Sequence, residues 1–553
     1  MKKTAFCLLL LSLFVIQSFA CTSILVGKKA SADGSAMITY AADSYAVYGE
    51  LYHWPRAKYA SGTKMEMFDW ESSQYLGEIL QFPETNNVVG YINEHQLCIG
   101  ETTFSGRPEL VDSTGIMDYG NLIFLALQRA KTAREAIRVM TSLVEEYGYF
   151  SSGESFSFAD KNEIWIMEMI GKGVGRKGAV WVAVRIPDDC IAAHANQSRI
   201  HQFPLNDPEN CLYSKDVISF AREMGYYKGT DENFSFANAY NPLDWGGLRF
   251  CEARVWSFFN KYADADATQW LPYILGEDPT PMPLYVKPKQ KLSLENVMEM
   301  MRDHYEGTPF DPTTDVGAGP FHSPYRFNPL SFQVDEKKYG FERPISTQQT
   351  AFSFVGQTRD YLPDEIGGIL WFATDDANCS VYTPMYGSMT RVPDCYRVGN
   401  GNMTTFSWTS FFWLNNWVAN MVYPFYSRMI PDVKSVQKEL ETEFRAIQEK
   451  KEKEFAEGLK KDRNKAVEEI TGYSIATAQK AAGRWKELGE YLIVKYIDGV
   501  IKKEDVAPDG QKQFKRTIHN GNEYPNRPLL DEKFLREVIK EKGDWLEQKE
   551  IKN

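Results

Sequence analysis

The sequence predicts a layered domain that mixes α-helices and β-strands, followed by a mainly helical C-terminal region. β-rich runs stand near the start, in "TSILVG" (22–27) and "SAMITYA" (35–41), and again late, in "GGILWFATDDANCSVYTPMYG" (367–387). A stretch with helical periodicity, residues 120–147, lies between them. Strand-rich segments around helices are typical of layered α+β or α/β domains, and we expect the α+β class.

The first 20 residues have the pattern of a secretory signal. Two lysines precede an apolar run over residues 5–16, and the segment ends in Ser18-Phe19-Ala20, a small-x-small cleavage pattern. The apolar run is shorter than the roughly 20 residues that a membrane-spanning helix needs, and no later segment is both long and charge-free enough. We therefore expect cleavage before Cys21 and a mature chain that is exported, periplasmic or extracellular, without a transmembrane segment.

The two β-rich runs after the signal predict a hairpin. The turn dipeptide Asp33-Gly34 lies between them. A hairpin centred near residue 31 brings Cys21 opposite about Ala41. Tyr40 and Asp43 are then close to the new N-terminus, which places a carboxylate beside the thiol.

The elements that follow alternate between strand and helix patterns. "GYINEHQLCIGETTF" (90–104) predicts a turn, a strand and a loop, with Glu101 to Thr103 in the loop. Apolar residues at three- and four-residue steps predict one helix over about 120–147. Residues 156–171 predict two strands around a polar turn, and 179–187 and 190–196 continue the β pattern.

The composition changes from Pro431 onward. "VKSVQKELETEFRAIQ" predicts an amphipathic helix, and "EKKEKEFAEGLKKDRNK" is highly charged. The apolar face of the first helix consists of Val433, Val436, Leu440, Phe444 and Ile447. We expect a signal over 1–20, a main domain over 21–430 and a charged, mainly helical region over 431–553. These helices either pack by one stripe onto the main domain or bind a partner.

Composition and cysteine count limit the classes of function. The net charge of −12 and the pI near 5.3 argue against a nucleic-acid partner, which needs a basic surface. Seven cysteines remain after the signal, and an odd number in an exported protein leaves at least one thiol free. Cys190 with Cys211 and Cys379 with Cys395 are candidate disulfides that spacing alone does not establish. The sequence leaves open whether chains associate into homo-oligomers.

Cleavage before Cys21 would give one residue both a thiol and a free α-amine. An α-amine has a pKa of about 7.7 to 8.0, so it can act as a general base near neutral pH, whereas a lysine at about 10.4 cannot without a large shift. Thiol, amine and an orienting carboxylate form an N-terminal-nucleophile site. Two alternatives remain: Cys21 is lipidated as a surface anchor, or it is a structural cysteine. Ser18 stands where lipid-attachment signals carry an aliphatic residue, and lipidation would acylate the amine.

Other enzyme signatures are absent from the sequence. It contains no HExxH zinc helix, no GxSxG elbow and no GxxxxGK[ST] phosphate loop. His194 and His201 fit ordinary polar histidines better than partners of a papain-like cysteine. The oxyanion of an N-terminal-nucleophile site would need hydrogen-bond donors, and Glu101 to Thr103 and Asn196 are the candidates.

Several motifs together resemble a known family of cysteine dipeptidases. They are "CTSILVGKKASADGS" (21–35), "ADS" (42–44), "INEH" (92–95), "HANQSRI" (194–200), "RFCEARVW" (249–256), "VGQTRDYLPDEIGGILWF" (355–372) and "DDANCSVYTPMYG" (375–387). The family comprises N-terminal-nucleophile hydrolases related to secernins, penicillin V acylases, bile salt hydrolases and acid ceramidases. The resemblance covers most of the chain after Ala20. It implies a four-layer αββα sandwich, no metal, no organic cofactor and hydrolysis of an amide bond.

The resemblance also implies roles for individual residues. Cys21 matches the nucleophile, Asp43 the carboxylate near its amine, and Asn196 an asparagine that orders the oxyanion region. Where relatives carry an oxyanion asparagine this chain has only Glu101 to Thr103, so a backbone N–H or the Thr103 hydroxyl would have to serve. Arg249 or Arg254 corresponds loosely to the active-site arginine. Tyr40 stands where many relatives have an arginine, and a tyrosine cannot supply a fixed positive charge to the thiolate.

We therefore expect an exported cysteine peptidase that hydrolyses dipeptides or short peptides through Cys21. Two alternatives stay open. One is an amidase acting on N-acyl compounds, as the acylase relatives do. The other is a surface lipoprotein, anchored through Cys21, that binds its ligand without turnover.

Overall fold

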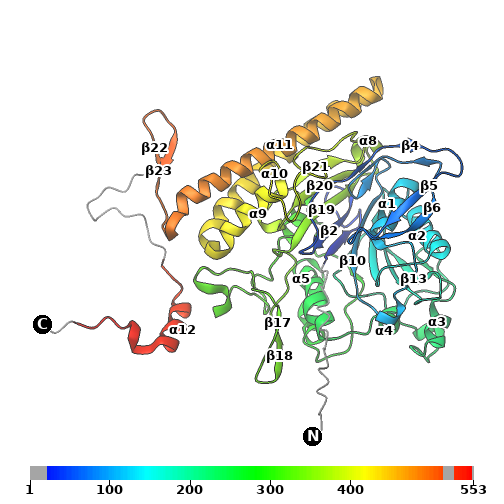
Figure 1. The fold of residues 1–553 in the computed structure, drawn as a ribbon, viewed down its shortest axis with the longest axis horizontal. Helices are drawn as coiled ribbons and strands as arrows, with labels where there is room; N and C mark the ends of the chain where they lie inside the picture. Colours follow the sequence, from blue (N-terminus) through cyan, green and yellow to red (C-terminus); the bar gives the residue numbers. More distant parts are fainter. Residues whose placement is uncertain (1–20, 515–528, 551–553) are drawn as a thin grey trace, which may run out of the picture.

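Two large antiparallel β-sheets and several helices make up the chain, in agreement with the predicted α+β class (Figure 1). The structure is a computed structural model that describes residues 21–514 and 529–550. The predicted signal, residues 1–20, lies outside the described residues.

The sheet that carries the N-terminal hairpin has seven strands in the order β16-β14-β1-β2-β19-β20-β21. Their bounds are β1 (Ser23–Val26), β2 (Ala36–Asp43), β14 (Ile191–His194), β16 (Tyr285–Val286), β19 (Thr350–Thr358), β20 (Ile369–Thr374) and β21 (Thr383–Tyr386). β1 and β2 form the predicted hairpin, and Thr22 pairs with Ala41 at its open end. That register places Cys21 within one residue of its predicted partner.

The second sheet has eight strands in the order β15-β13-β12-β11-β10-β9-β8-β3. Their bounds are β3 (His53–Trp54), β8 (Val88–Val89), β9 (Ile92–Asn93), β10 (Cys98–Thr103), β11 (Glu154–Ala159), β12 (Ile164–Gly171), β13 (Ala179–Ile186) and β15 (Cys211–Tyr213). Four short pairs stand apart: β4 (Ala57–Lys58) with β7 (Glu84–Thr85), β5 (Lys64–Phe68) with β6 (Tyr75–Leu80), β17 (Ser331–Val334) with β18 (Lys337–Gly340), and β22 (Glu504–Val506) with β23 (Lys512–Phe514).

Strands of the two sheets contact each other, β10 and β11 against β2. Glycines permit the close approach. A Cβ on Gly100 of β10 would lie 3.2 Å from the carbonyl oxygen of Thr39 and from the Cβ of Tyr40. A Cβ on Gly356 of β19 would lie 2.3 Å from the sulfur of Cys98. Side chains at this interface are therefore held close together, and the candidate site lies at its edge.

Helices contact both sheets. α1 (Tyr119–Arg129) and α2 (Ala133–Tyr147) contact the eight-stranded sheet. α5 (Ala253–Tyr262), α7 (Leu294–Met300), α9 (Phe411–Val422) and α11 (Arg463–Tyr496) contact the seven-stranded one. α10 (Tyr426–Lys461) packs along α11, and the remaining helices are α3 (Val217–Glu223), α4 (Phe236–Tyr240), α6 (Leu271–Ile274), α8 (Asp364–Gly367) and α12 (Glu532–Lys542).

The prediction of a single helix over 120–147 is wrong, because two helices occupy this range. α1 ends at Arg129, and α2 begins after Thr132, whose hydroxyl accepts a hydrogen bond from the amide of Glu135. A threonine that caps a helix N-terminus satisfies an amide that has no partner within the helix. The apolar periodicity continues across the break, so it did not reveal the cap.

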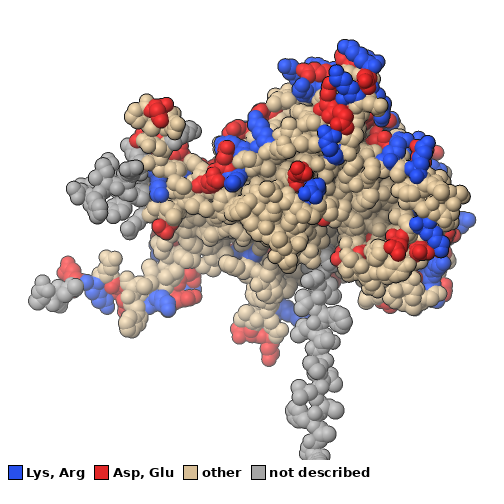
Figure 2. Space-filling model, turned by 45° about the horizontal axis from the view of Figure 1, so that its top comes forward, with Lys and Arg blue, Asp and Glu red and all other residues tan. Residues whose placement is uncertain are grey.

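α10 buries most of its predicted stripe. Val433 and Phe444 are buried, but Ile447 is 38% exposed, so its assignment to the stripe is wrong. Gln448 is buried in its place and donates a hydrogen bond to Glu452. Charged side chains of both signs gather where α10 meets α11 (Figure 2). Among residues 21–514 and 529–550, no helix is long and apolar enough to cross a membrane.

The seven cysteines of the described chain are all free. The candidate disulfides Cys190–Cys211 and Cys379–Cys395 are therefore not formed in this structure. Six of the seven are buried, and only Cys251 is partly exposed. Burial alone therefore does not set Cys21 apart from the other cysteines, and any special reactivity of its thiol must come from the neighbouring side chains.

Candidate active site

The Cys21 side chain lies between the two sheets, directly before β1. It is 4% exposed. Its sulfur lies 4.0 Å from the Tyr40 hydroxyl oxygen and 3.8 Å from Oε1 of Glu101, to which the thiol donates. In the 553-residue chain the Cys21 nitrogen is a peptide nitrogen that follows Ala20, and cleavage would convert it to an α-amine.

Tyr40 and Glu101 join the two sheets beside the thiol. The Tyr40 hydroxyl on β2 donates a short hydrogen bond to Oε1 of Glu101 on β10. The expectation of a loop at Glu101 to Thr103 is wrong, because these residues form the end of β10. They pair with β11, Glu101 opposite Phe156 and Thr103 opposite Glu154. Strand pairing fixes their direction more firmly than a loop would.

Glu101 and Glu154 are two buried carboxyl groups that face each other. The register places them diagonally on one face of the sheet, and both are 1% exposed. Burial raises the pKa of Glu101 to about 7, and it raises the pKa of Glu154 well above its ordinary value, with Glu101 as the second cause. Two carboxylates this close do not both ionise readily, so the pair holds a shared proton near neutral pH. Thr103 donates to Oε1 of Glu154 at 2.8 Å.

The same surroundings keep the thiol protonated. Burial, followed by the negative charges of Glu101 and Asp43, raises the pKa of Cys21 well above its ordinary value. The backbone N–H of Asp43 acts in the opposite direction by hydrogen-bonding the sulfur. A thiol in this environment needs a base in direct contact before it becomes a nucleophile.

Arg254 holds the segment on either side of the thiol in place. It lies at the start of α5, just after a π-helical turn over Gly247–Glu252. The buried guanidinium donates to Cys21 O at 2.5 Å, Thr22 Oγ1 at 2.7 Å, Phe250 O at 2.7 Å, Asn196 Oδ1 at 2.9 Å and Ala195 O at 3.0 Å. Burial lowers its pKa to about 10, so it remains charged at neutral pH.

Arg249, the other arginine of the same motif, lies elsewhere. Its guanidinium stacks over the rings of Trp245 and Phe310, with centroid distances of 5.7 and 4.9 Å. The structure therefore places Arg254, and not Arg249, beside Cys21. π-helical turns inside α-helices occur frequently at functional sites, and this one separates the two arginines.

Asn196 connects Arg254 to β10. It follows β14 with φ of 61°, a left-handed conformation that asparagine adopts more readily than most residues. Its side-chain amide donates to the carbonyl oxygen of Thr103 at 2.7 Å, and its Oδ1 accepts from Arg254. The asparagine side chain has a second N–H, which is available to a ligand.

Asp43 ends β2, and each oxygen of its carboxylate accepts one hydrogen bond. Arg343 donates to one oxygen at 2.7 Å and Thr350 to the other at 2.6 Å. Burial raises the pKa of Asp43 despite the guanidinium, and Arg343 is the largest opposing influence. The predicted carboxylate thus lies near Cys21 in a fixed orientation.

A model of peptidase family C69 matches residues 20–57 and 52–439. The chain belongs to this family. The match confirms the family that the motifs indicated, identifies the chain as an enzyme, and includes every residue described around Cys21.

Relatives of this C69 peptidase span most of its length. A probable dipeptidase of Salmonella dublin is 30% identical over 410 residues, which are 70% of this chain and 85% of the relative. A probable dipeptidase of Latilactobacillus sakei is 25% identical over 433 residues, 74% of this chain and 82% of the relative. Probable dipeptidase A of Streptococcus pyogenes serotype M18 (strain MGAS8232) is 25% identical over 443 residues, 76% of this chain and 85% of the relative.

Three residues of the C69 site were missed by sequence reasoning: Glu154, Arg343 and Thr350. Arg343 and Asp43 are 300 residues apart, and no local pattern marks either Arg343 or Thr350. For Glu154, the first residue of "ESFSFA" (154–159), the sequence did offer an indication. A glutamate in a strand that the sequence predicts as buried is costly without a partner, so Glu154 could have been recognised as a candidate.

His194 has a structural role in this C69 peptidase. Its Nδ1 lies 2.7 Å from the Thr102 hydroxyl and its Nε2 lies 2.6 Å from the Ser157 hydroxyl. Burial lowers its pKa to about 3, so the ring stays neutral. With both ring nitrogens engaged, it is an ordinary buried histidine, as the sequence indicated. Within residues 21–514 and 529–550, no three His, Cys, Asp or Glu side chains are grouped to hold a metal ion.

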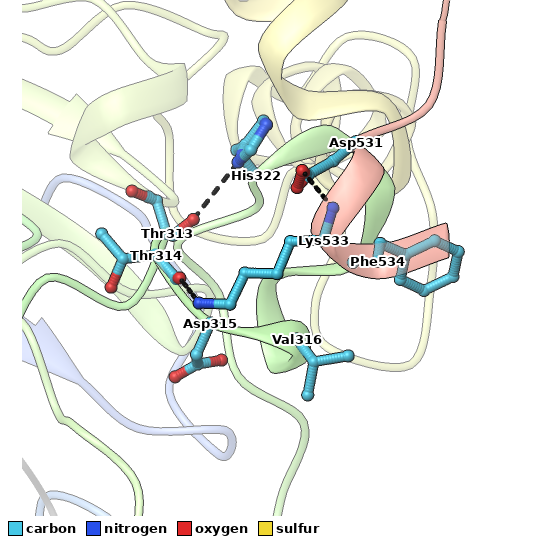
Figure 3. Close-up of a pocket in the computed structure, with 9 residues that line it drawn as sticks. Thr313, Thr314, Asp315, Val316, His322, Asp531, Lys533 and Phe534 are labelled. Carbon is cyan, nitrogen blue, oxygen red and sulfur yellow. Dashed lines mark hydrogen bonds between the residues drawn. The ribbon is translucent and has the colours of Figure 1, made fainter. Parts of the chain in front are cut away.

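A hollow of about 230 Å³ lies away from Cys21, between the N-terminal end of α12 and the segment 313–322 (Figure 3). Lys533 of α12 donates to the carbonyl oxygen of Thr314 at 2.7 Å across this hollow. The hollow is lined by Thr313, Thr314, Asp315, Val316, Gly319, His322, Asp531, Lys533 and Phe534. None of the residues around Cys21 lines this hollow, so it is separate from the candidate active site.

Proposed function

We propose that this chain is an exported dipeptidase whose nucleophile is the Cys21 thiol and whose general base is the α-amine released by cleavage after Ala20. The observation that carries the proposal is the environment of Cys21. The residue directly after a signal-cleavage pattern has its thiol against Glu101 and its carbonyl held by Arg254. The names of the relatives, probable dipeptidases, support peptides as substrates.

In the proposed reaction the α-amine takes the proton of the thiol, and the thiolate attacks the scissile carbonyl carbon. The free N–H of Asn196 donates to the oxyanion. The C–N bond breaks as the α-ammonium gives its proton to the leaving amine, and a thioester remains. Water, deprotonated by the amine, then attacks the thioester, releases the acid and restores the thiol.

Each neighbour has a positioning role in this scheme. Asp43, held by Arg343 and Thr350, orients the amine. Arg254 fixes the carbonyl of Cys21 and so the direction in which the amine points. We further propose that the two stacked sheets with helices on their outer faces are the αββα sandwich of N-terminal-nucleophile hydrolases.

The lipoprotein alternative fits the site less well. Lipidation attaches a diacylglyceryl group to the cysteine sulfur, and this sulfur is enclosed between two sheets with the side chain 4% exposed. A bulky lipid there would have to displace Tyr40 or Glu101, which contact the sulfur.

Mass and activity together test the proposal. The intact mass of the exported protein should correspond to a chain that begins at Cys21 without a lipid. The mature protein should hydrolyse members of a panel of dipeptides, and Cys21→Ala should be inactive while keeping its fold by circular dichroism. A diacylglyceryl mass on Cys21, or full activity in Cys21→Ala, would overturn the proposal.

A further inference from the structure

We propose that Glu101 and Glu154 form the subsite that binds the free α-ammonium group of the peptide substrate. The assignment rests on the proposed function and identifies which group of the substrate these residues recognise. Oε2 of each carboxyl is buried and has no hydrogen-bond partner among the described residues other than the facing carboxyl. One shared proton leaves the other lone pairs of these buried oxygens without a donor, which is costly, and an ammonium group supplies three donors.

The contrast with Asp43, the other buried carboxyl group near Cys21, supports a ligand role. Asp43 is paired with Arg343, and Glu252 is paired with Arg199 at 2.9 Å. Neither Glu101 nor Glu154 forms an ion pair with a lysine or arginine within the described chain. Of the buried carboxyls around Cys21, Asp43 therefore has its cation within the chain, whereas Glu101 and Glu154 can take one from the substrate.

Covalent geometry places a substrate ammonium at this pair. In an unblocked peptide the amino nitrogen lies about 2.5 Å from the first carbonyl carbon. A thiolate poised to attack lies about 3 to 3.5 Å from that carbon. The ammonium must therefore lie within a few ångströms of the Cys21 sulfur, and Oε1 of Glu101 is 3.8 Å from it. Thr103 and Asn196, next to the pair, are partly exposed, which gives a substrate access.

The charges also match one ammonium group. Burial raises the pKa of both carboxyls, so the pair with its shared proton carries one negative charge. A substrate ammonium supplies one positive charge. An N-acyl compound has no cation at this position and would leave the carboxylate buried and unpaired. The pair therefore favours unblocked peptides over the N-acyl amides that the sequence left open.

The test is a binding measurement that does not depend on turnover. Mature Cys21→Ala protein is titrated by calorimetry with alanyl-alanine and with isobutyryl-alanine, in which a methyl group replaces the ammonium. Alanyl-alanine should bind at least about 100-fold more tightly, because a site built to bind a donor rejects an analogue that lacks it. Equal affinities of the two compounds would overturn the assignment, whatever the activity of the wild type.

A variant identifies the residues responsible. Glu154→Gln keeps the acceptor for Thr103 and does not contact the sulfur, and it should reduce the preference for alanyl-alanine about tenfold or more. Glu78→Gln, on the exposed strand β6, is the matched control and should leave the preference unchanged. An unchanged preference in folded Glu154→Gln would overturn the role of the pair. Absence of turnover of every dipeptide by wild type would instead refute the proposed function, while the calorimetric preference would still decide the subsite.

Discussion

Replacing Arg254 by lysine tests whether one buried guanidinium organises the site. The guanidinium makes five hydrogen bonds to three separate segments. A lysine ammonium has three donors, so at least two of these bonds are lost even in the best case. Hydrogen bonds of charged groups contribute about 1.5–3 kcal/mol each, so we expect Arg254→Lys to lower the free energy of unfolding by about 3–6 kcal/mol.

Urea unfolding and kcat/KM measure the two consequences of this change. Arg249→Lys is the matched control, because Arg249 belongs to the same motif but only stacks on two rings. Its unfolding free energy should change by about 1 kcal/mol or less, since lysine keeps part of the cation–π interaction. Arg254→Lys should also reduce kcat/KM through misplacement of Cys21. If Arg254→Lys has the stability and kcat/KM of Arg249→Lys, the role assigned to Arg254 is refuted.

Two further predictions concern the carboxyl pair. Tyr40→Phe removes a hydrogen bond that lowers the pKa of Glu101, so this pKa should rise above about 7. The acidic limb of the pH profile of kcat/KM should then move to higher pH. An acidic limb at the same pH as in wild type would contradict this. The folded pair keeps a proton that unfolded glutamates release above about pH 4.5, so its contribution to stability falls as pH rises from 5 to 7, by up to about 1.4 kcal/mol per pH unit per proton. Urea unfolding should therefore show a steeper loss of stability over this range in wild type than in Glu154→Gln, and equal slopes would rule out the shared proton.

Local sequence predicted the part of the site that lies within one hairpin. β1 and β2 pair about a centre between residues 31 and 32, as the hairpin prediction assumed, so the proximity of Cys21, Tyr40 and Asp43 followed from counting residues. The sequence could not decide between Arg249 and Arg254, because that choice depends on which side of the helix each one occupies. A π-helical turn shifts the side-chain directions, whereas sequence periodicity assumes a regular α-helix.

The remaining site residues depend on pairings between distant segments. Glu154 reaches Glu101 only because β10 and β11 pair in one particular register, across an intervening pair of helices. Arg343 meets Asp43 across 300 residues. The break between α1 and α2 depends on a single capping threonine, which a continuous apolar pattern conceals.

The central claim, that the α-amine of Cys21 is the general base, is tested most directly by one extra residue. A mature protein that begins at Cys21 is compared with one that retains Ala20, which keeps the thiol but turns the amine into a peptide nitrogen. General-base catalysis contributes about 10²- to 10⁴-fold, so kcat/KM on a dipeptide should fall by at least about 100-fold in the extended protein. Equal kcat/KM for the two proteins, with Ala20 shown by mass to be still attached, would contradict the account.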